Sequence, residues 1–159
     1  MNFTNILRIL ENLLNEHERL YTLSLKKVDV IKQNDIEALN QIMKDEQKHV
    51  ASITILENER QQELQKIFPE KSNPTIRDCI EHAGPVDKLR LENLYQKLLT
   101  VIEKLKEQNE LNQQLIYNSL QFVNFSLNLF RPKSESVTYG PPAKKQPPKD
   151  GASVFNSQA

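Results

Sequence analysis

The chain has 159 residues, 38% of them hydrophobic, and its 21 Lys and Arg residues balance 21 Asp and Glu residues. This length suits one domain, and the zero formal net charge excludes the large basic field that a nucleic-acid backbone requires. Gly84 is the one glycine before residue 132, which argues against strand-rich folds with frequent glycine turns and against a glycine-rich phosphate loop.

The first half of the chain predicts a helical hairpin. Apolar residues recur at intervals of three and four, which predicts a first helix over about residues 5–32. Asn34, with Glu37 three residues later, is predicted to cap a second helix that spans about residues 35–68 and ends before a proline. Because the intervening turn is short, we expect these two helices to pack antiparallel.

The apolar stripe of the second helix is interrupted by Glu46 and Arg60. We expect this stripe to face the bundle interior, as amphipathic helices usually do. Its members are Ile36, Leu39, Ile42, Met43, Val50, Ile53, Leu56, Leu64 and Ile67.

The second half predicts two more helices and a tail. A capping pattern from Thr75 to Asp78 predicts a short helix that ends near residue 82. A third long helix is predicted over about residues 86–130, with Gln108 and Asn112 as polar residues on its apolar stripe. Residues 132–159 contain five of the eight prolines, and we expect them to form a flexible extension.

These elements predict an all-α protein. We expect an elongated antiparallel bundle, or coiled coil, of three long helices with a short connecting helix and a disordered C-terminal tail. The domain boundaries that follow are residues 1–131 for the helical domain and 132–159 for the tail.

Two groups of residues raise the question of chemistry. Glu46 and His49 form one Glu-x-x-His motif, whereas a di-iron bundle needs two such motifs and two further glutamates. Cys79 and His82 lie three residues apart, but no orienting group or oxyanion site accompanies them, so packing is the better interpretation for Cys79. We therefore expect no enzyme, no metal site and no cofactor.

The segment from Leu120 to Phe130 has more apolar surface than a bundle helix needs. Seven apolar residues spread over roughly 220° of the helix, while Gln121, Asn124 and Asn128 share one narrow face. The alternation over residues 125–129 also permits a strand. Three interpretations remain open: the segment folds back or closes a homodimer, it docks an amphipathic partner helix, or, less favoured, it lies in a membrane surface.

The expected location is the cytoplasm, without direct membrane insertion. No apolar run approaches the roughly 20 residues that span a bilayer, and the first residues lack the pattern of a signal peptide. The single cysteine cannot form an internal disulfide.

Several short patterns, in this order, resemble the FlgN family of flagellar type III export chaperones. They are the turn at residues 33–35 followed by Ile36 and Leu39, the stretch Glu57-Asn58-Glu59-Arg60, the stretch Asn112-Gln113-Gln114-Leu115-Ile116, and Tyr139-Gly140. The resemblance covers about residues 5–140.

The resemblance implies a chaperone that binds the C-terminal helices of the hook-associated proteins FlgK and FlgL. It would prevent their premature assembly and deliver them to FlhA, the membrane-bound export gate. Tyr139 is the residue that would contact this gate. The implied client-binding residues are Leu111, Leu115, Ile116, Leu120, Phe122, Val123, Phe125, Leu127 and Leu129.

The alternative from another functional class is a homodimeric coiled-coil scaffold or adaptor unrelated to secretion. This alternative predicts strong self-association and no binding of junction proteins, and a chaperone that dimerises only when free is compatible with the first interpretation.

Overall fold

The structure is a computed structural model that describes residues 1–130. The chain divides after Leu120 into two units, and of the second unit the structure describes residues 121–130. The described residues contain four helices: α1 (Thr4–Lys32), α2 (Ile36–Ile67), α3 (Ile76–His82) and α4 (Pro85–Phe130). The all-α prediction is confirmed, with three long helices packed antiparallel and one short connecting helix. The described part of the predicted 120–130 segment is helical rather than extended. The predicted tail lies outside the described residues.

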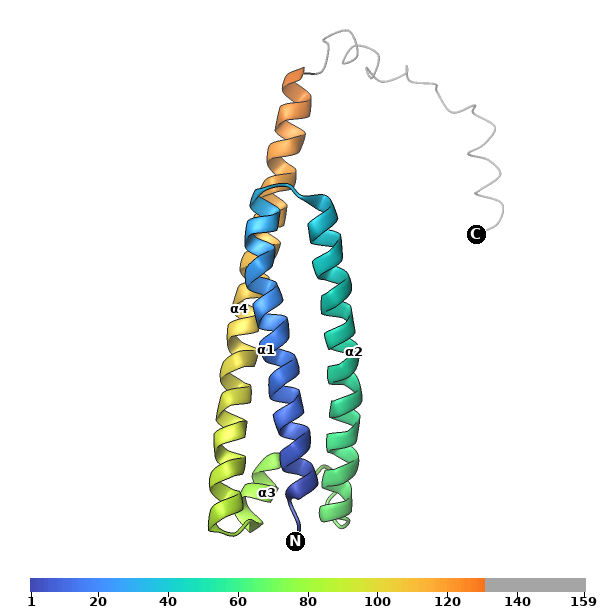
Figure 1. Cartoon of the computed structure of the whole chain (residues 1–159), viewed down its shortest axis with the longest axis vertical. Coiled ribbons are helices and arrows are strands. Elements are labelled where there is room, and N and C mark those ends of the chain that lie inside the picture. The colour runs from blue at the N-terminus through green and yellow to red at the C-terminus, as the bar shows by residue number, and fades with distance from the viewer. Residues whose placement is uncertain (131–159) are drawn as a thin grey trace, which may run out of the picture. The chain divides into compact units, whose positions relative to one another are not determined.

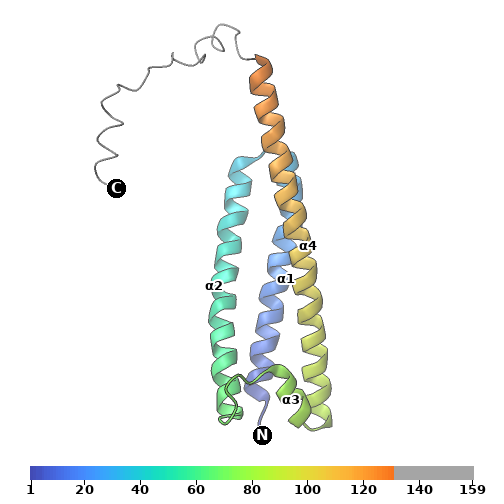
Figure 2. The ribbon, with the colours of Figure 1, turned by 180° about the vertical axis from the view of Figure 1, so that it is seen from behind.

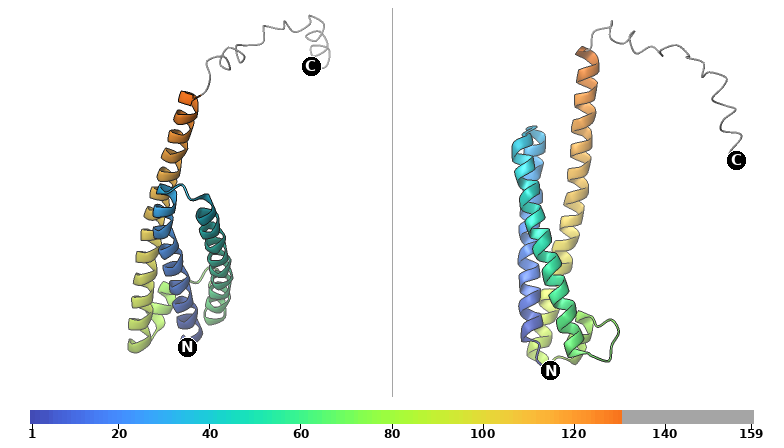
Figure 3. Two further views of the ribbon diagram at one scale, coloured as in Figure 1. Left: turned by 45° about the horizontal axis from the view of Figure 1, so that its top comes forward. Right: turned by 90° about the vertical axis from the view of Figure 1, so that its right-hand side faces the viewer.

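Within residues 1–120, α1 occupies the middle of the bundle. Views from the front and from behind both place it between α2 and the first part of α4 (Figures 1 and 2). The left view in Figure 3 likewise places α1 between α2 and the first part of α4. This central position explains why α1 contributes nine buried residues, whereas α2 contributes one, Leu64.

The turn between α1 and α2 corrects one prediction. Asp35, not Asn34, is the N-cap of α2, because the Asp35 carboxylate accepts a 3.0 Å hydrogen bond from the Ala38 backbone N–H. Asn34 instead has a positive φ of 54°. Asparagine tolerates this left-handed conformation better than most residues, so Asn34 closes the turn while its neighbour caps the helix.

The connecting helix α3 begins with the predicted capping pattern. The Asp78 carboxylate accepts hydrogen bonds from the backbone N–H of Thr75, at 2.7 Å, and from its hydroxyl, at 3.0 Å. The Lys71 ammonium adds an ion pair to the same carboxylate. These contacts fix the start of α3 to the connector that precedes it, while the buried Ile76 and Cys79 pack α3 into the core at the bundle end that contains the N-terminus (Figure 1).

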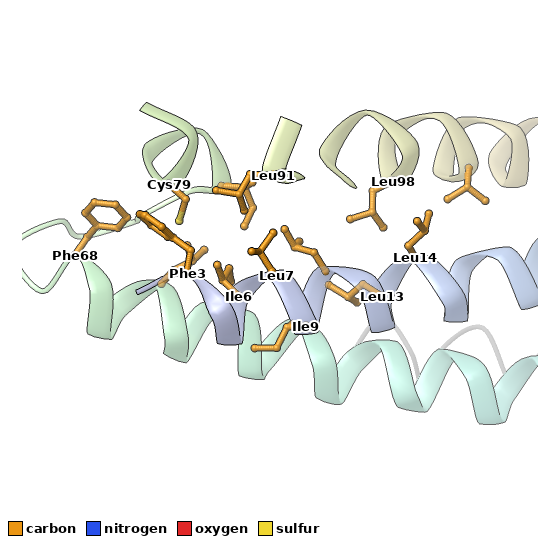
Figure 4. Close-up of a cluster of buried hydrophobic side chains, with 14 residues drawn as sticks. Phe3, Ile6, Leu7, Ile9, Leu13, Leu14, Phe68, Cys79, Leu91 and Leu98 are labelled. Atoms are coloured by element: carbon orange, nitrogen blue, oxygen red, sulfur yellow. The ribbon is translucent and has the colours of Figure 1, made fainter. Parts of the chain in front are cut away.

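The hydrophobic core is concentrated at this end of the bundle. Phe3 and the first three turns of α1 meet Phe68, Cys79 on α3, and Leu91 and Leu98 on α4 (Figure 4). Burying each large side chain contributes about 1.5–3 kcal/mol before the loss of conformational entropy is counted. Four segments of the chain therefore share one core here.

Farther along α1, the buried residues are Leu20, Ile31 and one polar residue, Ser24. Ser24 is fully buried, and its backbone oxygen accepts a 2.7 Å hydrogen bond from the Asn112 side-chain amide of α4. The amide of Gln108 donates in turn to the oxygen of the Asn112 side chain, at 3.1 Å. The predicted polar positions of α4 are thus satisfied in this seam, which we call the α1–α4 polar seam (Ser24, Gln108 and Asn112).

The apolar stripe of α2 differs from the prediction. Ile36, Met43 and Val50 have exposed fractions of 71%, 43% and 52%, although Leu64 is buried. The expectation that the whole stripe faces the interior was therefore wrong. Since α2 lies beside α1 and not α4, one neighbouring helix cannot cover the full width of its apolar face.

Candidate protein-binding surface

The second unit begins with a helical segment that is apolar and uncharged. Residues 119–130 contain no Asp, Glu, Lys or Arg. We call residues 122–129 the terminal apolar segment. Its five large apolar side chains have exposed fractions between 44% and 68%: Phe122, Val123, Phe125, Leu127 and Leu129.

The predicted site residues in the first unit are covered to different degrees. Leu111 and Leu120 are exposed by 46% and 58%. Leu115 and Ile116 are half-buried, so part of each side chain already packs within residues 1–120. The helical assignment of α4 is unbroken through Asn112 and this whole stretch. The predicted residues thus share one helix, and Leu115 and Ile116 are the ones that also serve the bundle.

The exposed side chains need an explanation. Covering a side chain of this size stabilises a complex by about 1.5–3 kcal/mol, and contiguous exposed apolar surface usually marks an interaction site. The segment carries no charge that could form a salt bridge with a partner. The terminal apolar segment therefore offers a partner apolar contacts and no ion pairs.

A second surface, which the sequence analysis missed, is a groove between α2 and α4. It has a volume of about 530 Å³ and is closed at one end by the start of α3. Its floor is α1, and we call it the α2–α4 groove. The side chains that line it include Leu10 and Leu13 of α1, Ile53, Glu57 and Arg60 of α2, Ile76 and Arg77 of α3, and Tyr95, Leu98, Leu99 and Ile102 of α4.

One signal in the sequence points to this groove. Ile36, Met43 and Val50 are spaced by seven residues, and the next member of the series is Glu57, which lines the groove. A heptad series on a helix normally marks the seam with a neighbouring helix. The sequence alone could not show that this seam has no neighbour among the described residues.

The Cys79 thiol is a packing group. It is fully buried in the core, and burial raises its pKa to about 11, so the nucleophilic thiolate is strongly disfavoured near neutral pH. The nearby imidazole of His82 stacks edge-on against Phe68, with ring centroids 5.3 Å apart. Its Nδ1 lies 2.8 Å from the backbone oxygen of Asp78. These contacts support a structural role for both residues.

The Glu-x-x-His motif of α2 joins α2 to α1. The Glu46 carboxylate accepts a 2.7 Å hydrogen bond from the Lys27 ammonium of α1. Nδ1 of His49 lies 2.6 Å from the Glu16 carboxylate, also on α1. In residues 1–130, no three His, Cys, Asp or Glu side chains gather as a metal-binding group. The motif thus supplies one ion pair, Lys27–Glu46, and one polar contact, His49–Glu16, between the two helices of the hairpin.

Two other predictions concern the export-gate contact and the membrane. Tyr139, the predicted export-gate contact, lies outside the described residues. Across residues 1–130, every helix is too polar or too short in its apolar stretches to cross a membrane.

Comparison with known proteins identifies the family. The family model described as "FlgN protein" matches residues 1–147. A Bacillus subtilis (strain 168) protein described as "Uncharacterized protein YvyG" is 33% identical over 160 residues, and the alignment covers all of both chains. No solved structure matches the chain. The chain therefore belongs to the FlgN family of cytoplasmic, non-enzymatic flagellar export chaperones.

Proposed function

We propose that this chaperone binds the C-terminal helices of the hook-associated proteins FlgK and FlgL. The observation that carries the proposal is the terminal apolar segment, an uncharged helix with five exposed large side chains. Clients that assemble by pairing amphipathic helices need those helices covered before export. An apolar helix supplies the matching surface without a covalent step.

The client-binding element would be the C-terminal part of α4, from Leu111 to Leu129. Leu111 and Leu120 add exposed apolar side chains on the same helix, and the exposed parts of Leu115 and Ile116 add further apolar area. Binding would cover this surface, and the client would then pass to the export gate FlhA, with Tyr139 as the proposed gate contact.

The test is isothermal titration of the full-length chain with the C-terminal helical segments of FlgK and FlgL. We expect micromolar or tighter binding. Replacing Phe122 and Phe125 with Gln removes about 1.5–3 kcal/mol of burial for each side chain, so affinity should fall by at least a hundredfold. Because both side chains are exposed, helicity by circular dichroism should stay near the wild-type value.

The matched control replaces Val86 and Leu89, two exposed apolar residues at the start of α4, with Gln. This control should bind the client segments with unchanged affinity. A loss of helicity in the Phe122/Phe125 variant would show instead that these residues belong to the core of the fold.

Sedimentation of the free chain separates the scaffold alternative from the chaperone. A stable homodimer whose formation depends on Phe122 and Phe125, together with no heat on mixing with either client, would support a self-associating scaffold. For the gate contact, Tyr139→Ala should weaken binding to the cytoplasmic domain of FlhA while client binding is retained.

A further inference from the structure

The α2–α4 groove has the geometry of a bundle that lacks one helix. Its floor is the central helix α1, and its two walls, α2 and α4, lie on opposite sides of that helix within residues 1–120. We propose that an amphipathic helix of the exported client docks in this groove as the fourth helix of the bundle. The inference rests on the proposed function, and it adds a second contact surface that uses none of residues 122–129.

The groove lining favours an apolar helix face. Buried Leu10 and Leu13 of α1, the exposed Leu99 and Ile102 of α4, and Ile53 of α2 all line the groove. Leu99 and Ile102 retain 45% and 44% exposure, so covering them removes apolar surface from water without displacing a packed side chain.

The unpartnered seam on α2 sets the length of the docked helix. The series Ile36, Met43 and Val50 continues in heptad register to Glu57 inside the groove. From Ile36 to Glu57 the helix rises by about 32 Å, since each residue adds about 1.5 Å. A client helix of roughly 20 residues, with its own apolar heptad stripe, would match this length.

The charge at the α3 end of the groove predicts which charge the docked helix carries there. The guanidinium of Arg60 is already engaged by the Glu57 carboxylate, at 2.7 Å and 2.9 Å. Arg77 on α3 is exposed, and no ion pair joins it to another residue within the described chain. The lining therefore carries one surplus positive charge, and the docked helix is expected to place a carboxylate beside Arg77.

The experiment compares full-length variants by isothermal titration with the C-terminal helical segments of FlgK and FlgL. Replacing Leu99 and Ile102 with Gln should weaken client binding by about ten- to a hundredfold, because two apolar contacts are lost. Arg77→Glu should weaken it by about three- to tenfold, and the loss should shrink at high salt. The control Val86→Gln/Leu89→Gln, with exposed apolar residues of the same helix outside the groove, should bind like the wild type.

A photo-crosslinking side chain locates the partner directly. Placed at Ile102 or Met43, it should crosslink to the client segment, whereas at Leu89 it should not. Client affinity that is unchanged in the Leu99/Ile102 variant but lost in the Phe122/Phe125 variant would overturn the groove proposal and leave the chaperone function intact.

The other outcomes are equally decisive. If the Leu99/Ile102 variant alters self-association but not client affinity, a second copy of this chain occupies the groove and the proposal is wrong. If the wild-type chain binds neither client, the proposed function fails, and the groove proposal fails with it.

Discussion

Asn112 shows how one polar residue in an apolar stripe sets the alignment of two helices. It is 3% exposed. Its side chain donates a hydrogen bond to the Ser24 backbone oxygen and accepts one from the Gln108 side chain. Its amide can reach the Ser24 oxygen only when α1 and α4 have one particular register, while Gln108, on the same helix, holds the Asn112 side chain in place. The α1–α4 polar seam therefore contributes specificity where the apolar core has ended.

We predict that Asn112→Ala lowers the free energy of unfolding by about 1–3 kcal/mol, because the buried partners lose a hydrogen bond. Urea denaturation followed by circular dichroism measures this change. Asn109→Ala, an exposed position on the same helix, should change stability by less than about 0.5 kcal/mol. Equal effects of the two substitutions would contradict the role assigned to the seam.

At the scale of the element, α3 depends on one carboxylate. The Asp78 carboxylate accepts hydrogen bonds from the Lys71 ammonium and from Thr75, and these contacts lower the pKa of Asp78 from 3.8 to about 2. A seven-residue helix has little stability of its own, so its attachment depends on such contacts and on the burial of Ile76 and Cys79.

The direction of the pH effect follows from that lowered pKa. The folded state holds the Asp78 proton less tightly than the unfolded state does. The contribution of the Asp78 carboxylate to the free energy of unfolding is therefore fully present above about pH 4 and is lost as the pH falls to about 2. Asp78→Asn should therefore be less stable than the wild type at pH 5, and the difference should narrow toward pH 2. Urea titrations at several pH values measure this convergence.

Lys71→Gln supplies the second variant for this prediction. It removes the largest cause of the lowered pKa, so the pH dependence that Asp78 contributes should shrink while the Thr75 contacts remain. Parallel stability curves for the wild type and Asp78→Asn across this pH range would refute the assignment.

Local signals allowed the helices and their antiparallel packing to be predicted, whereas the individual contacts between helices could not be. Apolar spacing, prolines and the capping pattern of α3 placed the helices to within one or two residues of their bounds in residues 1–130. The cap of α2 was misassigned because Asn34 and Asp35 are both good capping residues, and the choice depends on backbone φ. Adjacent candidates of this kind are separated only by the geometry of the turn.

Of the two candidate surfaces, one could be predicted from the sequence and the other could not. The terminal apolar segment was predictable because its apolar width exceeds what a bundle helix can bury. The α2–α4 groove could not be predicted, because it depends on the distance between α2 and α4 in the folded bundle. Ile36, Met43 and Val50 therefore looked like core residues in the sequence and are exposed in the structure.

For the Met1–Leu120 unit as a whole, packing is uneven along the bundle. The apolar core gathers residues from 3–14, 64–68, 76–79 and 91–101. The end nearer the α1–α2 turn has fewer buried apolar residues, Leu20 and Ile31 of α1, besides the polar seam and the ion pair of Lys27 with Glu46. Regions with few buried apolar contacts open at lower free energy than the core.

We predict that backbone amides of residues 6–14 and 91–101 exchange with solvent at least about tenfold more slowly than those of residues 36–45. Hydrogen exchange followed by mass spectrometry measures both regions in one experiment. Uniform protection along the three long helices would show that the bundle opens as a single cooperative unit.

The absence of charge in residues 119–130 has a consequence for how client binding would respond to conditions. Association through this segment would be nearly insensitive to ionic strength, and it would carry a negative heat-capacity change because it buries apolar surface. Its affinity would consequently vary with temperature more than with the salt content of the cell.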